Sequence, residues 1–215
     1  MEVSDVKPQK KRGRYNVFID GSFFCGLSER TITRYGIYRG KQVSSKEMRK
    51  VFENELIGRL YDRCIGKISR RPQSRQELIR YCKDVMWKKR DQWFNGTSVN
   101  DGVDEVSEWI IHQAIEKLGK DVDISDETFA AWWVSQRLAS GKRGWFQIKS
   151  ELIEKGIDVS VIDDIQITEQ DEYTAAREAM GRICKGVAEH KCRQRLARRG
   201  FSWSIIEKVM QDYRI

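Results

Sequence analysis

The sequence has little proline, little histidine and no long hydrophobic run. Only 2 prolines, together with 33% charged and 40% hydrophobic residues, favour a helical globular fold over a loop-rich or all-β fold. The 2 histidines have no ligand-spaced Cys, Asp or Glu around them, which disfavours a zinc site. No stretch approaches the length of a membrane span, and the N-terminus lacks the apolar segment of a signal peptide. We therefore expect a cytoplasmic protein without membrane contact.

The motifs that would mark an enzyme are also missing. The sequence contains no GxxxxGK[ST], GxGxxG or GxSxG. Residues 141–144 (GKRG) precede a predicted helix and would suit a phosphate at its N-terminus, but they lack the flanking strand of a nucleotide site, so we favour an ordinary loop. The Asp163-Asp164 pair is typical of a solvated helix surface rather than of general acid–base catalysis. We expect no enzymatic activity, no cofactor and no metal.

The cysteines are 5 in number and include no CxxC pair. Reduced thiols in a cytoplasmic protein are the simplest interpretation of an odd number. Cys64, Cys82 and Cys192 fall at apolar positions, which favours core packing over nucleophilic chemistry.

One short pattern occurs twice near the C-terminus, in residues 152–162 and again in residues 196–206. Gly156 and Gly200 stand where a left-handed residue ends a helix. Asp158 and Ser202 then offer N-caps for a following helix. Because the two helix–stop–helix units keep a constant spacing, the sequence predicts a helical repeat protein.

The N-terminal region differs from the repeats. Residues 1–13 are polar and basic and are predicted to be a disordered tail. Alternating residues on both sides of the Asp20-Gly21 turn predict a small β-hairpin over about residues 14–26. A short helix is expected from Ser28 to Tyr35, and Ser44 or Ser45 is expected to begin a longer helix.

An earlier, divergent copy of the repeat begins at a capping box formed by Ser74 and Glu77. Its larger offset implies an insertion near 84–110, which is either an extended helix with a loop or a partly mobile segment. With leading helices at 56–69, 126–139 and 168–184, the sequence predicts a mainly α protein. We expect three tandem three-helix repeats in an elongated array, at 44–123, 124–166 and 167–215, after an N-terminal segment at 14–43.

Basic residues carry most of the functional information. The net charge of +8 suggests a polyanionic partner. One basic position recurs in the three middle helices, at Arg75, Lys149 and Arg193. A second position does not recur, because only the last repeat has a cationic stripe, formed by Lys191 and Arg195 with Arg198.

The corresponding stripe of the second repeat is neutral or acidic, with Gln147, Glu151 and Glu154. A one-sided group of cations favours a binding face over an ordinary solvated helix. The candidate binding residues are Arg71, Arg75, Arg80, Lys142, Arg143, Lys149, Lys191, Arg193, Arg195, Arg198 and Arg199.

The tryptophans give weaker predictions. Phe129 and Trp133 lie four residues apart and are expected in the core, whereas Trp132 is on a neighbouring face and is expected to be exposed. Trp145 and Trp203 flank helix starts, and we favour packing over partner contact for both.

Three blocks of sequence resemble RecX, a family of bacterial regulatory proteins that act on the RecA recombinase. Residues 14–28 with 35–40 look like the N-terminal part of longer members, and residues 71–78 match the first repeat. The most specific block contains Asp126-Glu127, Phe129-Ala130, Trp133-Val134, Arg137, Lys142-Arg143-Gly144, Ile148, Glu151-Leu152 and Lys155-Gly156-Ile157. The resemblance covers about residues 14–82 and 116–210. The departures are residues 1–13, the insertion and Trp132.

The resemblance implies a non-enzymatic modulator, in the main an inhibitor, of RecA in homologous recombination, DNA repair and the SOS response. RecX proteins bind the RecA–single-stranded DNA filament in its groove or at its growing end, and lower ATP hydrolysis, strand exchange and co-protease activity. We expect a monomer with the RecA filament as partner and single- or double-stranded DNA as a second candidate. The alternative is a direct DNA-binding, helix-turn-helix-like protein. The change of charge between repeats counts against it.

Overall fold

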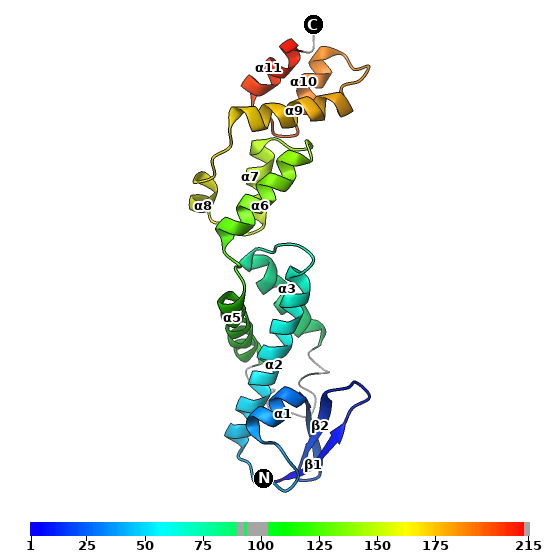
Figure 1. The fold of residues 1–215 in the computed structure, drawn as a ribbon, viewed down its shortest axis with the longest axis vertical. Helices are drawn as coiled ribbons and strands as arrows, with labels where there is room; N and C mark the ends of the chain where they lie inside the picture. Colours follow the sequence, from blue (N-terminus) through cyan, green and yellow to red (C-terminus); the bar gives the residue numbers. More distant parts are fainter. Residues whose placement is uncertain (90–92, 94–102, 213–215) are drawn as a thin grey trace. The chain divides into compact units, whose positions relative to one another are not determined.

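The computed structural model describes residues 1–89, 93 and 103–212, with side chains from residue 106 onward in the last range. The chain divides into two compact units, the first made of Met1–Arg71 and Leu78–Val122 and the second of Pro72–Glu77 and Asp123–Ile215. The described part is mainly helical with a small N-terminal sheet, so the predicted fold class is confirmed (Figure 1). Within the expected insertion near 84–110, residues 90–92 and 94–102 lie outside the described residues.

The sheet consists of three antiparallel strands, β1 (Val3–Pro8), β2 (Arg14–Ile19) and β3 (Ser22–Ser28), in the order β1-β2-β3. Asp20 and Gly21 have φ of 49° and 84°, the left-handed conformation that a tight hairpin turn requires, so the predicted hairpin is confirmed.

The prediction of a disordered tail over residues 1–13 is wrong for β1. Val3 is fully buried, and its backbone nitrogen donates a hydrogen bond of 2.9 Å to the carbonyl of Lys41. The remaining residues of β1 pair with β2 from Val6↔Val17 to Pro8↔Tyr15. Backbone pairing and one buried valine therefore order a segment whose composition is mainly polar.

The helices of the first unit begin and end where their capping residues predict. In α1 (Glu29–Tyr35), Ser28 is the N-cap and Gly36 the C-cap with φ of 54°. In α2 (Ser45–Ile68), the side chain of Ser44 accepts a hydrogen bond from the first turn. The unit is completed by α3 (Arg75–Lys88), whose first turn belongs to the second unit, and by α5 (Val103–Asp121).

A buried carboxylate, Glu55 of α2, joins the sheet to the helices. It accepts hydrogen bonds from Arg14 (2.7 Å), Arg59 (2.9 Å), the Thr31 hydroxyl (2.6 Å) and the backbone of Ser28 (3.0 Å). Burial alone would raise the pKa of Glu55, but these hydrogen bonds and the Arg59 charge outweigh burial and lower it. Glu55 therefore stays ionised at neutral pH and holds both guanidinium groups in place.

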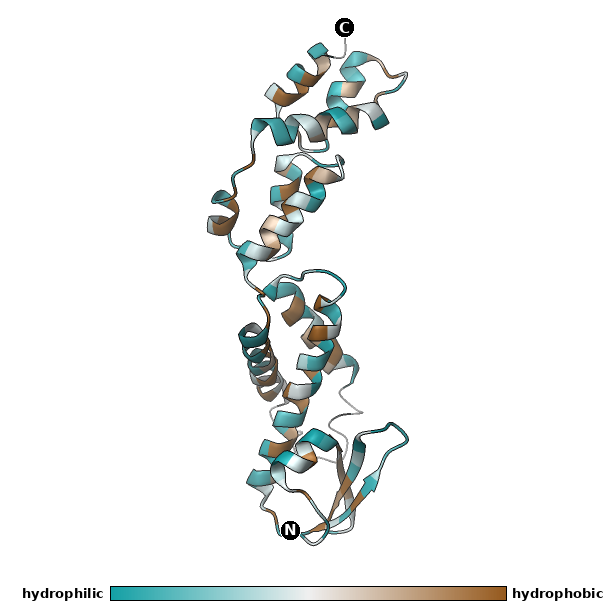
Figure 2. Ribbon diagram, in the orientation of Figure 1, coloured by the Kyte–Doolittle hydropathy of each residue, from teal (hydrophilic) through white to brown (hydrophobic). Residues whose placement is uncertain are grey.

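The second unit contains two consecutive three-helix repeats with separate cores. The helices are α6 (Asp126–Ala139), α7 (Trp145–Glu154) and α8 (Val159–Asp163), followed by α9 (Glu169–Ile183), α10 (Glu189–Ala197) and α11 (Trp203–Asp212). Apolar and polar segments alternate along these helices, as expected of amphipathic helices that cover a core on one side (Figure 2).

Both glycines and the Asp158 cap are confirmed among the turn signals of the repeats, whereas the Ser202 hydroxyl contacts the side chains of Glu172 and Ser204. Gly156 and Gly200 have the same positive φ of 81°. Asp158 caps α8 through a side-chain hydrogen bond. The capping box is formed as well, because Glu77 N donates to the Ser74 hydroxyl (3.0 Å) and Ser74 N donates to the Glu77 carboxylate (3.4 Å).

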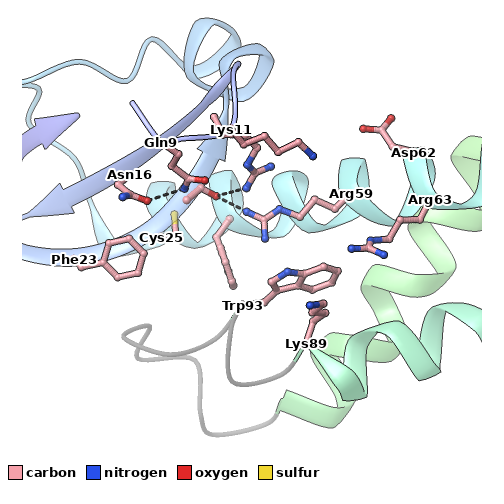
Figure 3. A pocket seen from close by; sticks show the side chains of 13 residues that line it. Gln9, Lys11, Asn16, Phe23, Cys25, Arg59, Asp62, Arg63, Lys89 and Trp93 are labelled. Carbon is pink, nitrogen blue, oxygen red and sulfur yellow. Dashed lines mark hydrogen bonds between the residues drawn. The ribbon is translucent and has the colours of Figure 1, made fainter. Parts of the chain in front are cut away.

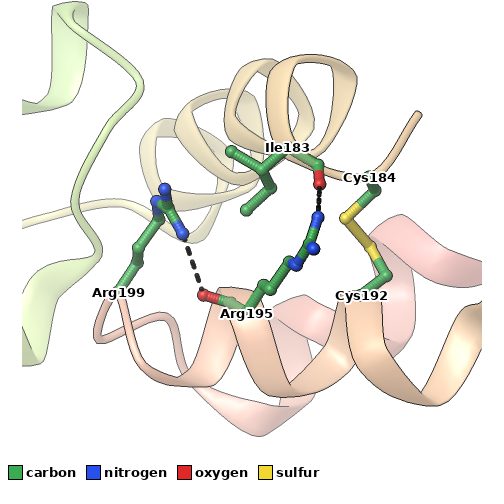
Figure 4. The surroundings of a disulfide bond; sticks show 5 residues. All are labelled: Ile183, Cys184, Cys192, Arg195 and Arg199. Carbon is green, nitrogen blue, oxygen red and sulfur yellow. Dashed lines mark hydrogen bonds between the residues drawn. A yellow bond between two sulfur atoms is a disulfide. The ribbon is translucent and has the colours of Figure 1, made fainter. Parts of the chain in front are cut away.

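Two cysteines form a disulfide, which corrects the expectation of five reduced thiols. Cys184 follows α9 and Cys192 lies in α10, with their Cα atoms 5.3 Å apart (Figure 4). The sequence does not reveal this approach, which depends on how α9 packs against α10. Cys25, Cys64 and Cys82 are free and buried.

The tryptophan predictions are corrected in part. Phe129 is buried as predicted, but Trp132 packs against the same core as Trp133, with its ring centroid 5.8 Å from that of Phe129. Both tryptophans are half-buried. Trp145 packs against this core, whereas Trp203 is 61% exposed, so the prediction of packing is wrong for Trp203.

Candidate partner-binding surface

Three segments of the second unit enclose a cationic cavity of about 310 Å³. The loop between α6 and α7, the last turns of α9 and the residue two positions after α10 line it. Its cations are Lys142, Arg143, Arg182 and Arg199. The sequence had predicted three of these four as binding residues, and the fold places them together.

Backbone contacts between the two repeats hold these segments in position. Gly144 N donates to the Arg199 carbonyl (2.8 Å), and Phe146 N donates to the Gly200 carbonyl (3.1 Å). The N-terminus of α7 thus meets the C-terminal end of α10, and each satisfies backbone groups that the other helix leaves unpaired. A Cβ atom on Gly144 would lie less than 3.0 Å from the Gly200 backbone, so this approach requires glycine.

A similar contact recurs one repeat earlier within the second unit. The Ser74 hydroxyl donates to the Lys155 carbonyl (2.8 Å), and a Cβ on Gly156 would lie 2.7 Å from the side chain of Gln76. The repeated glycine therefore has two functions. It ends the middle helix of one repeat, and it leaves space for the N-terminus of the preceding middle helix.

The charges around the cavity are only partly compensated. Arg143 lies 3.7 Å from Glu151, and Arg182 pairs with Glu178 at 3.2 Å. Within the described part of the chain, no carboxylate lies within ion-pair distance of Lys142 or Arg199. Two uncompensated cations at one cavity suit a phosphate or carboxylate of a partner.

The predicted stripe on α10 is exposed, but its members differ. Arg195 donates a hydrogen bond of 2.5 Å to the carbonyl of Ile183 at the end of α9 (Figure 4). This contact places a cation on a helix C-terminus, which stabilises the pair of helices. Among the described residues, no carboxylate forms an ion pair with Lys191 or Arg198. Both side chains are therefore available to bind another molecule.

The change of charge between repeats has a structural cause. Glu151 occupies the position that corresponds to Arg195, and it accepts hydrogen bonds from Trp133 Nε1 (3.0 Å) and Arg137 Nε (2.6 Å) of α6. In each repeat this side chain therefore anchors the middle helix to the leading helix. In the second repeat Glu151 binds the side chain of Arg137, and in the third repeat Arg195 binds the backbone carbonyl of Ile183.

The recurring basic position also makes structural contacts. Lys149 pairs with Asp163 (2.5 Å), and Arg193 pairs with Glu207 (2.7 Å) and with Glu189. Glu207 and then Glu189 raise the pKa of Arg193. In the second and third repeats, this position therefore links the middle helix to an acidic residue of the last helix, Asp163 in α8 or Glu207 in α11.

The other predicted binding residues lie elsewhere. Arg71 and Arg80 belong to the first unit, and Arg75 is in the first turn of α3. None of them lines the cavity, and their role stays a prediction. Conversely, the sequence did not identify Arg182, because Leu138 stands at the corresponding position of the second repeat. Its one signal is a basic residue in the last turn of a helix.

Among the described residues, no three His, Cys, Asp or Glu side chains are placed to share a metal ion. In the same part of the chain, no helix combines the length and apolar character that crossing a bilayer requires.

These features define a class: a helical repeat protein with a small N-terminal sheet and a cationic cavity between its second and third repeats. Two family models match the chain, the regulatory protein RecX N-terminal domain over residues 1–44 and the RecX second three-helix domain over residues 125–164. The second match spans α6, α7 and α8.

Whole-chain relatives agree with these matches. The regulatory protein RecX of Lactobacillus delbrueckii subsp. bulgaricus (strain ATCC BAA-365) is 24% identical over 219 residues, which cover 98% of this chain and 74% of the relative. That of Limosilactobacillus reuteri (strain DSM 20016) is 20% identical over 220 residues, covering 98% and 76%. A crystal structure of regulatory protein RecX shares the fold, with a TM-score of 0.64, 21% identity and 98% coverage of both chains. The chain is thus similar to the RecX family in these two domains and, through relatives named regulatory protein RecX, over nearly its whole length.

Proposed function

We propose that this protein is a non-enzymatic inhibitor of the RecA recombinase, which binds the RecA–single-stranded DNA filament and lowers ATP hydrolysis, strand exchange and co-protease activity. The relatives are named regulatory proteins, which supports a regulatory role. The observation that carries the proposal is the pair of uncompensated cations, Lys142 and Arg199, at the junction between the repeats.

The geometry suits a large polyanionic partner. Lys142 and Arg199 are supplied by different repeats, and the glycine contact at Gly144 and Gly200 fixes the spacing of the two segments. A partner that bridges them gains two charge contacts without ordering a loop. The charge also accelerates encounter with a filament that is rich in phosphate and carboxylate groups.

Binding to the filament can be separated from binding to DNA by its salt dependence. Anisotropy of a labelled oligo(dT) strand would be measured across a salt series, with and without RecA assembled on it. Contacts to phosphates release counterions, so we expect weak and strongly salt-dependent binding to the bare strand. Protein contacts should make binding to the filament tighter and less sensitive to salt. Equal affinity and equal salt slope for both targets would favour the direct DNA-binding alternative.

A charge-reversal variant, Lys142→Glu with Arg199→Glu, tests whether the cavity between the second and third repeats binds the filament. We expect at least a tenfold loss of filament affinity, since each change removes an attraction and adds a repulsion. The matched control is Lys120→Glu with Arg177→Glu, which reverses two exposed cations outside the cavity. Equal losses in both variants would show an effect of net charge and would remove the junction as the binding site.

A further inference from the structure

A second cationic cavity, of about 650 Å³, lies within the first unit. Its walls come from the turn after β1, from β2 and β3, from α2, and from Lys89 and Trp93 (Figure 3). This volume falls in the range of small-molecule sites. None of its lining residues is among the predicted binding residues, and the proposed RecA function uses none of them.

The floor of this cavity is rigid and already charge-balanced in part. Arg14 and Arg59 both bind Glu55 and both donate to the carbonyl of Gly26, at 3.1 Å and 2.5 Å. One carboxylate thus serves two guanidinium groups. Cys25, beside them, is buried, and burial raises the pKa of its thiol to about 12, so it adds no negative charge.

Three further cations surround the opening. Lys11, Arg63 and Lys89 come from three different segments and line the cavity together with Trp93 (Figure 3). Arg59 and Arg63 lie over the Trp93 ring, with 5.4 Å and 5.8 Å from each guanidinium carbon to its centroid.

Among the described residues, no carboxylate pairs with Lys11, Arg63 or Lys89. Of the lining residues that the structure describes, only Asp62 is acidic. With Glu55 included, five described cations face two described carboxylates, an excess of three positive charges among these residues. Lys11 and Arg63 are exposed and Lys89 is half-buried, so all three can reach an anion, and their combined charge favours one that carries more than one negative charge.

The cavity also offers an aromatic surface. Phe23 is 44% exposed and lines the cavity, and its ring meets that of Phe18 edge-on at 5.8 Å. Because Phe23 is partly exposed, its ring is accessible to a planar group. Cations and an accessible aromatic ring lining one cavity are the combination that binds phosphate and base of a nucleotide together.

We propose that this cavity binds the terminal phosphate monoester of a nucleotide, with its phosphate among Lys11, Arg63 and Lys89 and its base against Phe23. A terminal monoester carries up to two negative charges, whereas an internal phosphodiester carries one, so the charge excess favours the terminal group. The nucleotide is either free or the 5′-terminal residue of a DNA strand, and both present the same chemistry.

Calorimetric titrations of the full chain with defined probes test this assignment. The probes are dTMP, inorganic phosphate, and oligo(dT) with either a 5′-phosphate or a 5′-hydroxyl. Binding of dTMP, of the phosphorylated strand, or of both is the expected result, and the pattern identifies the source. No binding of either, or equal binding of the phosphorylated and hydroxyl strands without binding of dTMP, would overturn the proposal.

Variants then place the binding in this cavity. Lys11→Ala with Arg63→Ala and Lys89→Ala should weaken binding of the nucleotide probe at least tenfold while the melting temperature stays near that of the parent. The charge-matched control, in which Lys46, Lys50 and Lys120 become Ala, removes three exposed cations of the same unit and should leave affinity within twofold. Equal losses in the two triple variants would overturn the proposal.

Phe23→Ala provides a separate readout for the base. It should weaken nucleotide binding several-fold and leave binding of inorganic phosphate unchanged. An equal effect on both probes would contradict stacking on Phe23. Because these titrations contain no RecA, their outcome is independent of the proposed inhibition.

Discussion

A Cβ atom on Gly200 would lie less than 3.0 Å from the backbone nitrogen and the side chain of Gln147. The N-terminus of α7 reaches the end of α10 only because residue 200 has no side chain. The same residue has φ of 81°, which L-amino acids other than glycine rarely adopt. One glycine therefore ends a helix, and also admits the neighbouring repeat beside the cationic cavity.

Gly200→Val should destabilise the protein strongly. A β-branched residue in the left-handed region costs about 1–3 kcal/mol, and the clash with Gln147 adds to this cost. We expect the free energy of unfolding, measured by urea denaturation, to fall by at least about 2 kcal/mol. The control is Gly181→Ala, because a Cβ there meets nothing within 4 Å and φ is not positive. That variant should be neutral or slightly more stable. Similar losses in both variants would contradict the repeat contact.

Reduction of the Cys184–Cys192 disulfide should lower stability. The bond closes a short loop between α9 and α10, and in the chain-entropy account a loop of this length contributes about 2.5 kcal/mol. Melting curves with and without a thiol reductant would measure the effect. The variant Cys184→Ser with Cys192→Ser should be insensitive to reductant. A parent protein whose melting temperature does not respond to reductant would contradict a stabilising bond.

Glu55 should make stability depend on pH in the acidic range. Its folded-state pKa lies below the ordinary value of 4.5, so it contributes stability above pH 4.5 that is lost as the pH falls through the folded-state pKa. Glu55→Ala leaves Arg14 and Arg59 without their shared carboxylate and should cost about 3–5 kcal/mol at pH 7.

Urea denaturation at pH 7 and at acidic pH would measure this dependence. Glu55→Gln keeps the shape of the side chain and one acceptor oxygen, and it should show a smaller loss of stability on acidification than the parent. An identical loss in parent and variant would show that other groups dominate the acid response.

The α10 stripe should contribute to binding without being required for folding. Reversing Lys191, Arg195 and Arg198 to Glu should weaken filament inhibition, but Arg195 also holds the end of α9 through Ile183. The sharper variant is therefore Lys191→Glu with Arg198→Glu, which changes exposed charges at little cost in stability. Its thermal melting should match that of the parent. Inhibition of RecA equal to that of the parent would remove the stripe from the binding surface.

The second repeat supplies the control for this stripe, with one restriction. Glu151 binds Trp133 and Arg137, so changing it to Lys would disturb the core of the repeat. The control is therefore limited to Gln147→Lys with Glu154→Lys. If the face of the second repeat that carries Gln147, Glu151 and Glu154 contacts protein rather than phosphate, these changes should not enhance inhibition.

Local signals in the sequence predicted the helices well. The helix caps act through contacts within a few residues, so the sequence is sufficient to predict them. They are Ser28, Ser44, Gly156 and Gly200. The features that the sequence did not reveal depend on residues far apart in the chain. Strand β1 is ordered by pairing with β2, and Glu55 is recognised as a shared anchor only once α2 packs against the sheet.

The candidate surface shows the same division. The sequence identified Lys142, Arg143 and Arg199 as binding residues, but the repeat comparison also selected Lys149 and Arg193, which pair with acids of their own repeats. Sequence patterns mark where cations recur and do not tell which of them already have partners. Only the packing of α8 and α11 supplies those partners.

Hydrolysis of ATP by RecA on single-stranded DNA, titrated with this protein, tests the central claim most directly. We predict that hydrolysis falls as the parent protein is added, and that Lys142→Glu with Arg199→Glu needs at least tenfold more protein for the same effect. Hydrolysis and filament length that stay unchanged at saturating parent protein would contradict the account.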